Sequence, residues 1–171
     1  GEAINKIKRK ELQGINVTTP YKQTIIPFLD LVINEAKEIS SVNTIYLNDE
    51  NKVIGENTDV YGFDCSFIKK LKKKDLFEKT ILILGAGGVT PAIIYALLQK
   101  KIKKIFLSNR TIQKIENIKK KYPFIEIIPW EDIENKSHNM DVIINTTSLG
   151  MKNGSDFDQI IKKVKTDLIY Y

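Results

Sequence analysis

A glycine-rich turn lies near the middle of the chain, between an apolar run and a helical pattern. Residues 85–90 read Gly-Ala-Gly-Gly-Val-Thr, and the preceding run, residues 80–84, has the pattern of a buried parallel strand. Glycines let a chain turn tightly and let a pyrophosphate approach the backbone at the start of a helix. The sixth position holds Thr90 instead of the Gly or Ala of the dinucleotide-binding fingerprint. The turn therefore predicts dinucleotide binding through an imperfect motif, with a purely structural turn as the alternative.

The end of the next expected strand indicates which dinucleotide this would be. NAD-binding folds usually place Asp or Glu about 20 residues beyond the glycines, to hold the ribose 2′-hydroxyl. Here residues 108–111 read Ser-Asn-Arg-Thr, Lys114 follows one turn later, and no acid is present. An arginine at this point can stack on adenine and pair with a 2′-phosphate. The segment therefore favours NADP over NAD, with a surface arginine at a helix start as the alternative.

Small polar side chains recur where other apolar runs end. They lie in residues 16–22, 41–44 and 55–59 of the first half, and in residues 144–151 of the second. Ligand-holding groups usually sit at strand ends that face a cleft. The residue types alone leave open whether Lys22 and Asp59 act together or form an ordinary surface ion pair.

Alternating strand and helix patterns fill the second half of the chain. Strands are expected over residues 80–84, 104–108, 125–128, 141–145 and 167–171, and helices over residues 92–101, 112–121 and 157–164. This alternation predicts an α/β fold with a parallel sheet and helices on both faces.

The first half is less regular. A short strand is expected over residues 15–17, a helix over 23–31, and a hairpin from 43–47 and 53–56. A long amphipathic helix over residues 60–72 would then connect two lobes. We therefore expect one lobe over residues 1–58 and a second over 59–171.

Composition limits the classes of function. The chain has 171 residues, of which 42% are hydrophobic, and no apolar run approaches the roughly 20 residues of a membrane span. The net charge of +6 comes almost entirely from scattered lysines, which favours attraction of an anionic ligand over nucleic-acid binding. One cysteine, Cys65, and one histidine, His138, exclude an internal disulfide and an ordinary Cys/His zinc site, and they argue against a histidine-based triad. We expect Cys65 to be a small apolar filler on a helix and His138 to be an exposed loop residue.

The polar segments together resemble the successive motifs of the shikimate dehydrogenase family, in order and spacing. They read N-V-T-T-P-Y-K, S-V-N-T, G-E-N-T-D, G-A-G-G, S-N-R-T and I-N-T-T-S-L-G-M, and the resemblance runs from about Gly14 to Tyr171. It implies a Rossmann-type doubly wound parallel sheet preceded by part of a smaller α/β substrate lobe, with the active site between them. It also implies NADP-dependent reduction of 3-dehydroshikimate to shikimate.

The resemblance assigns roles residue by residue. The implied catalytic pair is Lys22 and Asp59. The implied contacts to substrate hydroxyls are Thr18, Asn43 and Asp59. The implied cofactor-binding residues are Gly85, Ala86, Gly87, Gly88 and Val89 in the turn, Asn109, Arg110, Thr111 and Lys114 after the second strand, and Thr146, Thr147, Ser148, Gly150 and Met151 after the fourth.

The chain also departs from the family pattern. It lacks the family's N-terminal segment, whose paired serines hold the substrate carboxylate, and its C-terminal segment, whose glutamine contacts substrate, so we expect a partial sequence. Val60 stands where many members have glycine. One alternative, an NAD-dependent quinate/shikimate dehydrogenase, would predict an acid near Arg110. The other, a non-catalytic dinucleotide-binding remnant, would have lost the Lys22 and Asp59 pair. We expect a small-molecule substrate, no nucleic-acid or membrane partner, a monomer or homodimer, and a cytoplasmic location.

Overall fold

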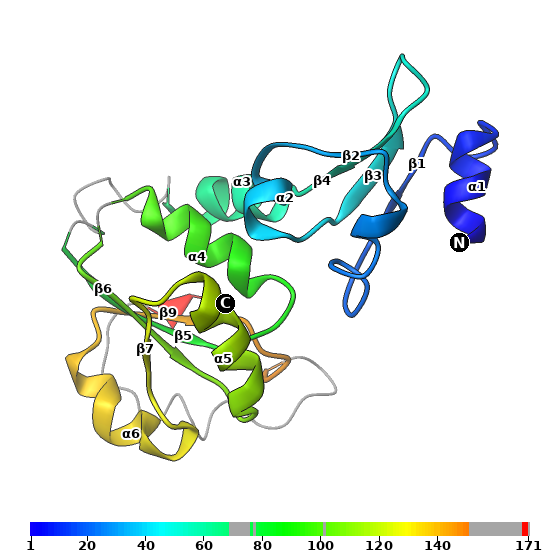
Figure 1. The fold of residues 1–171 in the computed structure, drawn as a ribbon. Coiled ribbons are helices and arrows are strands. Elements are labelled where there is room, and N and C mark those ends of the chain that lie inside the picture. The colour runs from blue at the N-terminus through cyan, green and yellow to red at the C-terminus, as the bar shows by residue number, and fades with distance from the viewer. Residues whose placement is uncertain (69–75, 77, 101, 151–168, 171) are drawn as a thin grey trace.

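The computed structural model describes residues 1–68, 76, 78–100, 102–150 and 169–170. Its ribbon forms two lobes, one around a small sheet near the N-terminus and one around a larger twisted sheet (Figure 1). Below, the first lobe is the part before residue 59 and the second lobe is the remainder. No helix in the described ranges combines the length and the apolar character that crossing a membrane requires.

The first lobe is built on a mixed four-stranded sheet in the order β1-β3-β4-β2. Its elements are α1 (Glu2–Lys8), β1 (Gly14–Asn16), the 3₁₀ helix η1 (Ile26–Phe28), β2 (Leu31–Val32), α2 (Asn34–Ile39), β3 (Thr44–Leu47) and β4 (Val53–Glu56). The predicted hairpin is confirmed, because β3 and β4 pair antiparallel with Thr44 opposite Glu56 and Leu47 opposite Val53. Helices α1 and α2 cover the sheet through buried Ile4, Ile7 and Ala36.

The helix predicted over residues 23–31 is wrong. The segment forms only the three-residue η1, and Leu31 already belongs to β2. Pro27 explains the difference, because it has no N–H to donate to the carbonyl of Gln23 and its ring clashes with that position in an α-helix. The backbone then forms hydrogen bonds with the sheet instead of within a helix: the N–H of Asp30 donates to the carbonyl oxygen of Val53 at 3.0 Å.

The second lobe contains a five-stranded sheet in the order β7-β6-β5-β8-β9, with every neighbouring pair parallel. The strands are β5 (Thr80–Leu84), β6 (Lys104–Ser108), β7 (Glu126–Ile127), β8 (Val142–Asn145) and β9 (Ile169–Tyr170). This order is that of the Rossmann fold, whose ligands bind outside the carboxyl ends of the strands where the order reverses. The predicted α/β class and doubly wound sheet are therefore confirmed.

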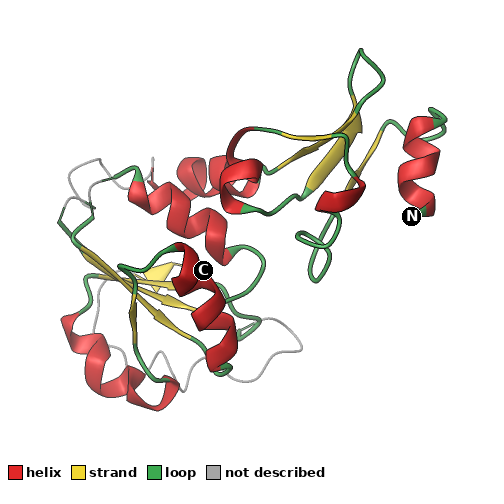
Figure 2. Ribbon diagram, in the orientation of Figure 1, coloured by secondary structure: helices red, strands yellow, loops and turns green. Residues whose placement is uncertain are grey.

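Helices cover both faces of this sheet (Figure 2). They are α3 (Asp59–Phe63), continued by a π-helical segment (Asp64–Ile68), α4 (Thr90–Leu98), α5 (Ile112–Lys121), the 3₁₀ helix η4 (Trp130–Asp132), α6 (Ile133–Lys136) and the 3₁₀ helix η5 (Ser137–Asn139). Alternation along β5 separates the two faces: Ile81 and Ile83 pack with residues of α3, α4 and α5, while Leu82 and Leu84 pack with Ile133 of α6.

Several predicted features fall partly outside the described residues. The helix predicted over residues 60–72 begins at Asp59 and continues to Ile68 as the π-helical segment, and residues 69–75 are not described. The helix predicted over residues 157–164 and the site residue Met151 also lie outside the described ranges.

His138 is exposed, as expected, but it lies within η5 and not in a loop. Cys65 is half-buried in the π-helical segment and forms no disulfide.

One residue of the first lobe belongs to the core of the second. Ile39, at the end of α2, is 2% exposed and packs in the same cluster as Phe63, Leu97 and Tyr122. Beside it, the Lys121 ammonium donates a hydrogen bond to the carbonyl oxygen of Glu38. Buried contacts therefore cross the predicted boundary between residues 58 and 59. The division into two lobes at that point stays a prediction.

Candidate active site

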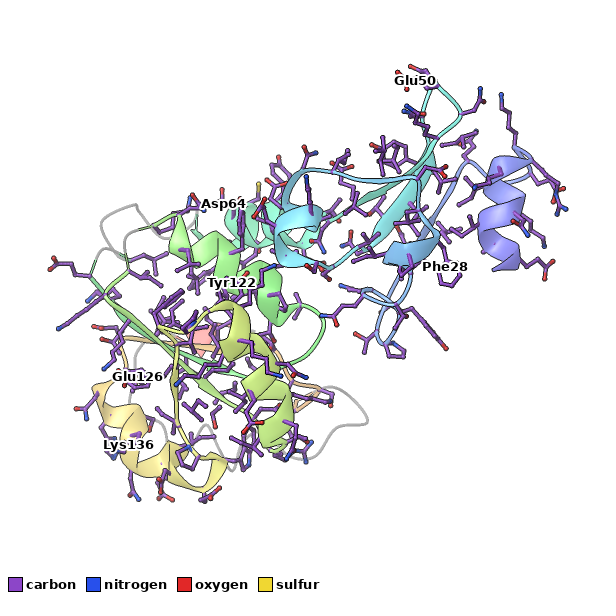
Figure 3. The ribbon with its side chains drawn as sticks, viewed as in Figure 1. Phe28, Glu50, Asp64, Tyr122, Glu126 and Lys136 are labelled. Carbon is purple, nitrogen blue, oxygen red and sulfur yellow. The ribbon has the colours of Figure 1, made fainter. Side chains whose placement is uncertain are left out.

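Lys22 of the first lobe and Asp59, the first residue of the second lobe, form an ion pair. Lys22 Nζ lies 2.7 Å from Asp59 Oδ2, and the two side chains are 13% and 22% exposed. The Lys52–Glu50 pair at the hairpin tip has a similar length of 2.8 Å, but its side chains are 50% and 69% exposed. Figure 3 shows Glu50 at the far end of the hairpin loop. The Lys22–Asp59 pair is therefore not an ordinary surface pair.

Two asparagines hold Asp59, one through its carboxylate and one through its backbone N–H. The amide of Asn43 donates to Asp59 Oδ1 at 2.9 Å, so both carboxylate oxygens have a donor. The backbone N–H of Asp59 donates to Asn57 Oδ1 at 2.9 Å, and the amide of Asn57 donates to the carbonyl oxygen of Ser41 at 3.0 Å. Asn57 is 3% exposed, so its two hydrogen bonds are made away from solvent.

The strand ends bring these segments together. Strand β4 ends at Glu56 and the antiparallel strand β3 begins at Thr44, so residues 41–44 and 55–59 meet at one edge of the sheet. The segment carrying Lys22 joins them, because the carbonyl of Lys22 accepts the N–H of Val42 at 2.8 Å. The sheet of the first lobe thus explains why residues far apart in sequence converge here.

The glycine turn of the second lobe lies directly against Lys22. Gly88 packs so closely that a Cβ atom there would lie 3.0 Å from Thr19 Oγ1 and 3.5 Å from Lys22 Cδ. The hydroxyl of Ser41 also donates to the carbonyl oxygen of Gly88 at 3.4 Å. The predicted catalytic pair and the predicted dinucleotide turn therefore face each other across the two lobes.

The segment after β6 is tied to the same turn. Asn109 Oδ1 accepts the N–H of Ala86 at 3.2 Å, and its amide donates to the carbonyl oxygen of Thr111 at 2.9 Å. Arg110 is exposed, and its guanidinium carbon lies 6.0 Å from the ring centre of Trp130. Asn109 therefore links the turn to the segment that presents Arg110 at the carboxyl end of the sheet.

The loop after β8 closes on itself. Thr147 Oγ1 donates to Asn145 Oδ1 at 2.7 Å and accepts the N–H of Leu149 at 3.1 Å. The amide of Asn145 in turn donates to the carbonyl oxygen of Leu149 at 3.1 Å. Ser148 and Gly150 are exposed, and Gly150 has a positive φ of 86°, a conformation that favours glycine.

A cavity of about 650 Å³ lies between the lobes, within the usual volume of a small-molecule site. Its wall contains Lys22 and Gln23 from the first lobe and residues of the glycine turn, α4 and α5 from the second. The members of the predicted site on this wall are Lys22, Ala86, Gly87, Gly88 and Lys114. Asp59, Arg110 and the loop after β8 are not among its lining residues. Thr18 is exposed, and its carbonyl accepts the N–H of Tyr21 at 2.9 Å.

Comparison with known sequences assigns the family. The profile described as shikimate/quinate 5-dehydrogenase matches residues 68–153, which is half of the chain, and that of the shikimate dehydrogenase substrate binding domain matches residues 1–45. The chain belongs to the shikimate/quinate 5-dehydrogenase family. The resemblance inferred from the six motifs is thereby confirmed.

Individual members of the family align along nearly the whole chain. The shikimate dehydrogenase (NADP(+)) of Pelagibacter ubique is 44% identical over 170 residues, covering 99% of this chain and 62% of its own length. The crystal structure of shikimate dehydrogenase from Aquifex aeolicus matches with a TM-score of 0.79 and 37% identity, over 99% of this chain and 70% of that one. A solved shikimate dehydrogenase in complex with NADP+ matches with a TM-score of 0.76 and 30% identity, over 89% of this chain and 53% of that one. The chain thus spans about 62% of the length of the curated relative.

Three buried polar residues of this family member lie at the site but outside the predicted set. They are Ser41, Asn57 and Thr90, with exposures of 1%, 3% and 0%. Each of the three lies within or beside one of the six motifs. A motif alone does not show whether a side chain faces a ligand or the protein interior. The burial and the hydrogen-bond partners of these side chains show that they face the protein interior.

Proposed function

We propose that this chain carries the catalytic and cofactor-binding core of an NADP-dependent shikimate dehydrogenase, which interconverts 3-dehydroshikimate and shikimate. The observation that carries the proposal is the partly buried Lys22–Asp59 ion pair, held against Gly88 of the dinucleotide turn. The name of the Pelagibacter ubique relative supports the choice of substrate and cofactor.

The glycine turn fits a dinucleotide. Gly85 has a φ of 105°, and a Cβ atom there would lie 2.5 Å from Thr146 Oγ1, so the backbone needs glycine at this position. The turn leads into the N-terminus of α4, and the N-terminus of a helix favours binding of a phosphate group. The residues proposed to hold the pyrophosphate are Gly85, Ala86, Gly87, Gly88 and Val89.

The chemistry that the cofactor supplies is transfer of a hydride to or from the substrate carbon. As the carbonyl of 3-dehydroshikimate is reduced, negative charge develops on its oxygen, and the Lys22 ammonium donates a proton to that oxygen. Asp59 holds the ammonium in place through its 2.7 Å contact. In the reverse direction Lys22 accepts the hydroxyl proton of shikimate. Thr18, Asn43 and Asp59 are proposed to bind the substrate hydroxyls.

Positive charge near the second strand end supports NADP as the dinucleotide. Arg110 is exposed beside Trp130, and Lys114 lies on the cavity wall. A guanidinium and an ammonium there can form charge-assisted hydrogen bonds to a 2′-phosphate. The residues proposed for this selectivity are Asn109, Arg110, Thr111 and Lys114. Those proposed to lie beside the nicotinamide are Gly150 and Met151, the latter outside the described residues, and Thr146, Thr147 and Ser148 are the other proposed cofactor-binding residues of the same loop.

A turnover assay tests this function. NADP+-dependent oxidation of shikimate is followed by NADPH absorbance, with this chain beside a version extended at both ends by the flanking segments of a full-length relative. We expect robust turnover from the extended version and much weaker turnover from the chain alone, because the extension restores the family's remaining substrate contacts. An extended protein that binds NADPH but never oxidises shikimate would instead support the non-catalytic alternative. The expected oligomeric state and location stay predictions.

A further inference from the structure

The residue that makes the glycine turn an imperfect fingerprint is completely buried. Thr90, the sixth position, is 0% exposed and begins α4. Its hydroxyl oxygen accepts the N–H of Gly87 at 3.0 Å and lies 3.1 Å from the carbonyl oxygen of Gly85. A glycine or alanine at this position, as in the fingerprint, would make neither contact. Thr90 therefore binds two residues of the turn to the helix that follows it.

The same hydroxyl also reaches the loop after β8. Thr90 Oγ1 lies 3.0 Å from Thr146 Oγ1, and Thr146 Oγ1 lies 2.9 Å from the carbonyl oxygen of Leu84, the last residue of β5. The backbone N–H of Thr146 donates to that carbonyl as well, at 2.7 Å. The two hydroxyls thus join the end of β5, the glycine turn and the loop after β8 in one network.

The network satisfies the chemistry of both hydroxyl groups. A hydroxyl has one proton to donate and two lone pairs that accept. In one arrangement Thr90 donates to Gly85 and Thr146 donates to Leu84; in the other, one of the two protons bridges the hydroxyls. In either arrangement Thr90 still accepts the N–H of Gly87. The side chain of Thr146 is therefore occupied by protein atoms, although the sequence had predicted it as a cofactor contact.

We propose that Thr90 and Thr146 are a positioning pair that fixes the shape of the glycine turn for the dinucleotide. This inference rests on the proposed function, because it concerns the same site. Gly85 has a positive φ, a Cβ atom there would lie only 2.5 Å from Thr146 Oγ1, and its carbonyl oxygen accepts from the Thr90 hydroxyl at 3.1 Å. The pair acts through the turn backbone, so its hydroxyls need no contact with the cofactor.

The network predicts that cofactor binding depends on the hydroxyls while substrate binding does not. Lys22, Asp59 and Asn43 are held by one another and by first-lobe backbone, with no hydrogen bond to Thr90 or Thr146. Replacing Thr90 by valine keeps its volume but leaves the Gly87 N–H and the Gly85 carbonyl without their partner. The turn then changes conformation so that these groups find other partners. Binding of the dinucleotide must restore the original conformation, which weakens its affinity.

The experiment measures NADPH affinity by calorimetry for the parent chain and for Thr90→Val, Thr90→Ser, Thr146→Val and the double valine variant. We expect Thr90→Val to raise the dissociation constant about ten-fold, which is the effect of one to two hydrogen bonds, and Thr146→Val to raise it as well. Thr90→Ser restores the hydroxyl and stays within about two-fold of the parent. The double variant is no worse than about the worse single variant, because the two residues act as a unit. Thr24→Val, which removes an exposed first-lobe hydroxyl, is the matched control.

A second measurement separates positioning from loss of structure. In the extended protein, Thr90→Val raises the KM for NADP+ but leaves the KM for shikimate within about two-fold, whereas general destabilisation would affect both. If Thr90→Val does not fold, Thr146→Val and Thr90→Ser still decide the question through their opposite expected effects on NADPH affinity. Unchanged NADPH binding by Thr90→Val or Thr146→Val, or failure of Thr90→Ser to bind, overturns the positioning pair alone. A parent chain that does not bind NADPH overturns the proposed function and this inference together.

Discussion

Lys22 Nζ lies 2.7 Å from Asp59 Oδ2, although the two residues are 37 positions apart in the chain. The contact is reached through sheet pairing: Lys22 is held by the N–H of Val42, and Asp59 follows the end of β4. The ammonium side chain also borders Gly88 in the other lobe. Under the proposed function, this position places a proton donor between a substrate bound in the cavity and a bound dinucleotide.

The proposed proton transfer predicts a defect in turnover when Lys22 is removed. We expect Lys22→Ala in the extended protein to lower kcat by about two to four orders of magnitude, the usual range for general acid–base catalysis. The KM for shikimate changes far less, since the interaction strengthens only as charge develops on the oxygen. Lys52→Ala is the matched control, because it breaks an ion pair of similar length that is exposed at the hairpin tip. A higher KM with intact kcat would leave Lys22 with a binding role only.

Asp59 and Lys22 are expected to act as a unit. Asp59→Ala removes the partner of the ammonium and a proposed substrate contact, so it lowers kcat and weakens substrate binding. The variant lacking both side chains is expected to be little worse than the worse single variant, because effects of residues that act together are not additive. Steady-state kinetics of the three variants form a double-mutant cycle, and additive losses would contradict the unit.

Arg110 and Lys114 predict a preference for the phosphorylated cofactor. We expect NADPH to bind at least about ten times more tightly than NADH, since one charge-assisted hydrogen bond contributes roughly 1.5–3 kcal/mol. Arg110→Ala is expected to reduce this preference without changing NADH affinity. Calorimetry with both cofactors measures the preference. Arg9→Ala is the control, because Arg9 is exposed and is not among the residues that line the cavity. Equal affinities of the parent for the two cofactors would contradict the role of Arg110.

Asn57 is expected to support the site from inside the first lobe. Asn57→Ala leaves the carbonyl of Ser41 and the N–H of Asp59 without their side-chain partner. A buried polar group left unpaired costs about 1–3 kcal/mol, so chemical denaturation is expected to show a loss in that range. Asn48→Ala at the exposed hairpin turn removes one hydrogen bond of 2.8 Å and is expected to cost less. Equal losses for the two variants would show that burial of Asn57 is unimportant.

Tyr122 predicts a pH-dependent difference in stability. Burial, with Tyr95 and Glu38 as further causes, raises the pKa of its hydroxyl above the usual value of about 10. The hydroxyl oxygen is buried and has no hydrogen-bond partner among the described residues. Because the folded state favours the neutral phenol, this stabilisation is complete below about pH 10 and is lost as the pH rises through the folded pKa.

The test compares thermal unfolding of the parent and Tyr122→Phe between neutral pH and about pH 11. At neutral pH we expect little or no loss of stability in the variant, because phenylalanine keeps the packing and removes an unpaired buried hydroxyl. Above about pH 10 the parent is expected to lose stability relative to the variant. A parallel decline of both proteins would show that Tyr122 does not contribute to the pH dependence.

Local sequence patterns predicted the second lobe better than the first. Strands β5 and β6 and helix α5 have the predicted bounds, because each has the full periodicity of its element and is flanked by clear turn residues. Helices α1 and α2 were not predicted: with 7 and 6 residues, each makes fewer than two full turns, too short to produce a periodic pattern. In residues 23–31, Pro27 and pairing with β4 outweighed the apolar pattern that had suggested a helix.

The sequence motifs predicted the residues that could do chemistry at the site, but not the buried residues that support them. Lys22 and Asp59 were expected because charged residues in a recognised motif identify chemistry directly. Asn57 and Thr90 were missed as supporting residues, because their function depends on buried contacts with Ser41 and Gly85 that exist only after folding. Sequence also assigned Thr146 to the cofactor, which stays a prediction, and it gave no sign of the hydrogen bonds between the Thr146 hydroxyl and protein atoms.

The position of Ile39 has a consequence for how the chain denatures. This side chain leaves the first lobe and completes a core built otherwise from the second, so neither lobe can unfold without opening a hole in that core. Loss of a buried isoleucine costs about 2–5 kcal/mol, which is large beside the marginal stability of a domain. Melting of the two lobes is therefore thermodynamically linked, and calorimetry is expected to record one cooperative heat-absorption peak. Two separate peaks would mean that the lobes behave as independent units.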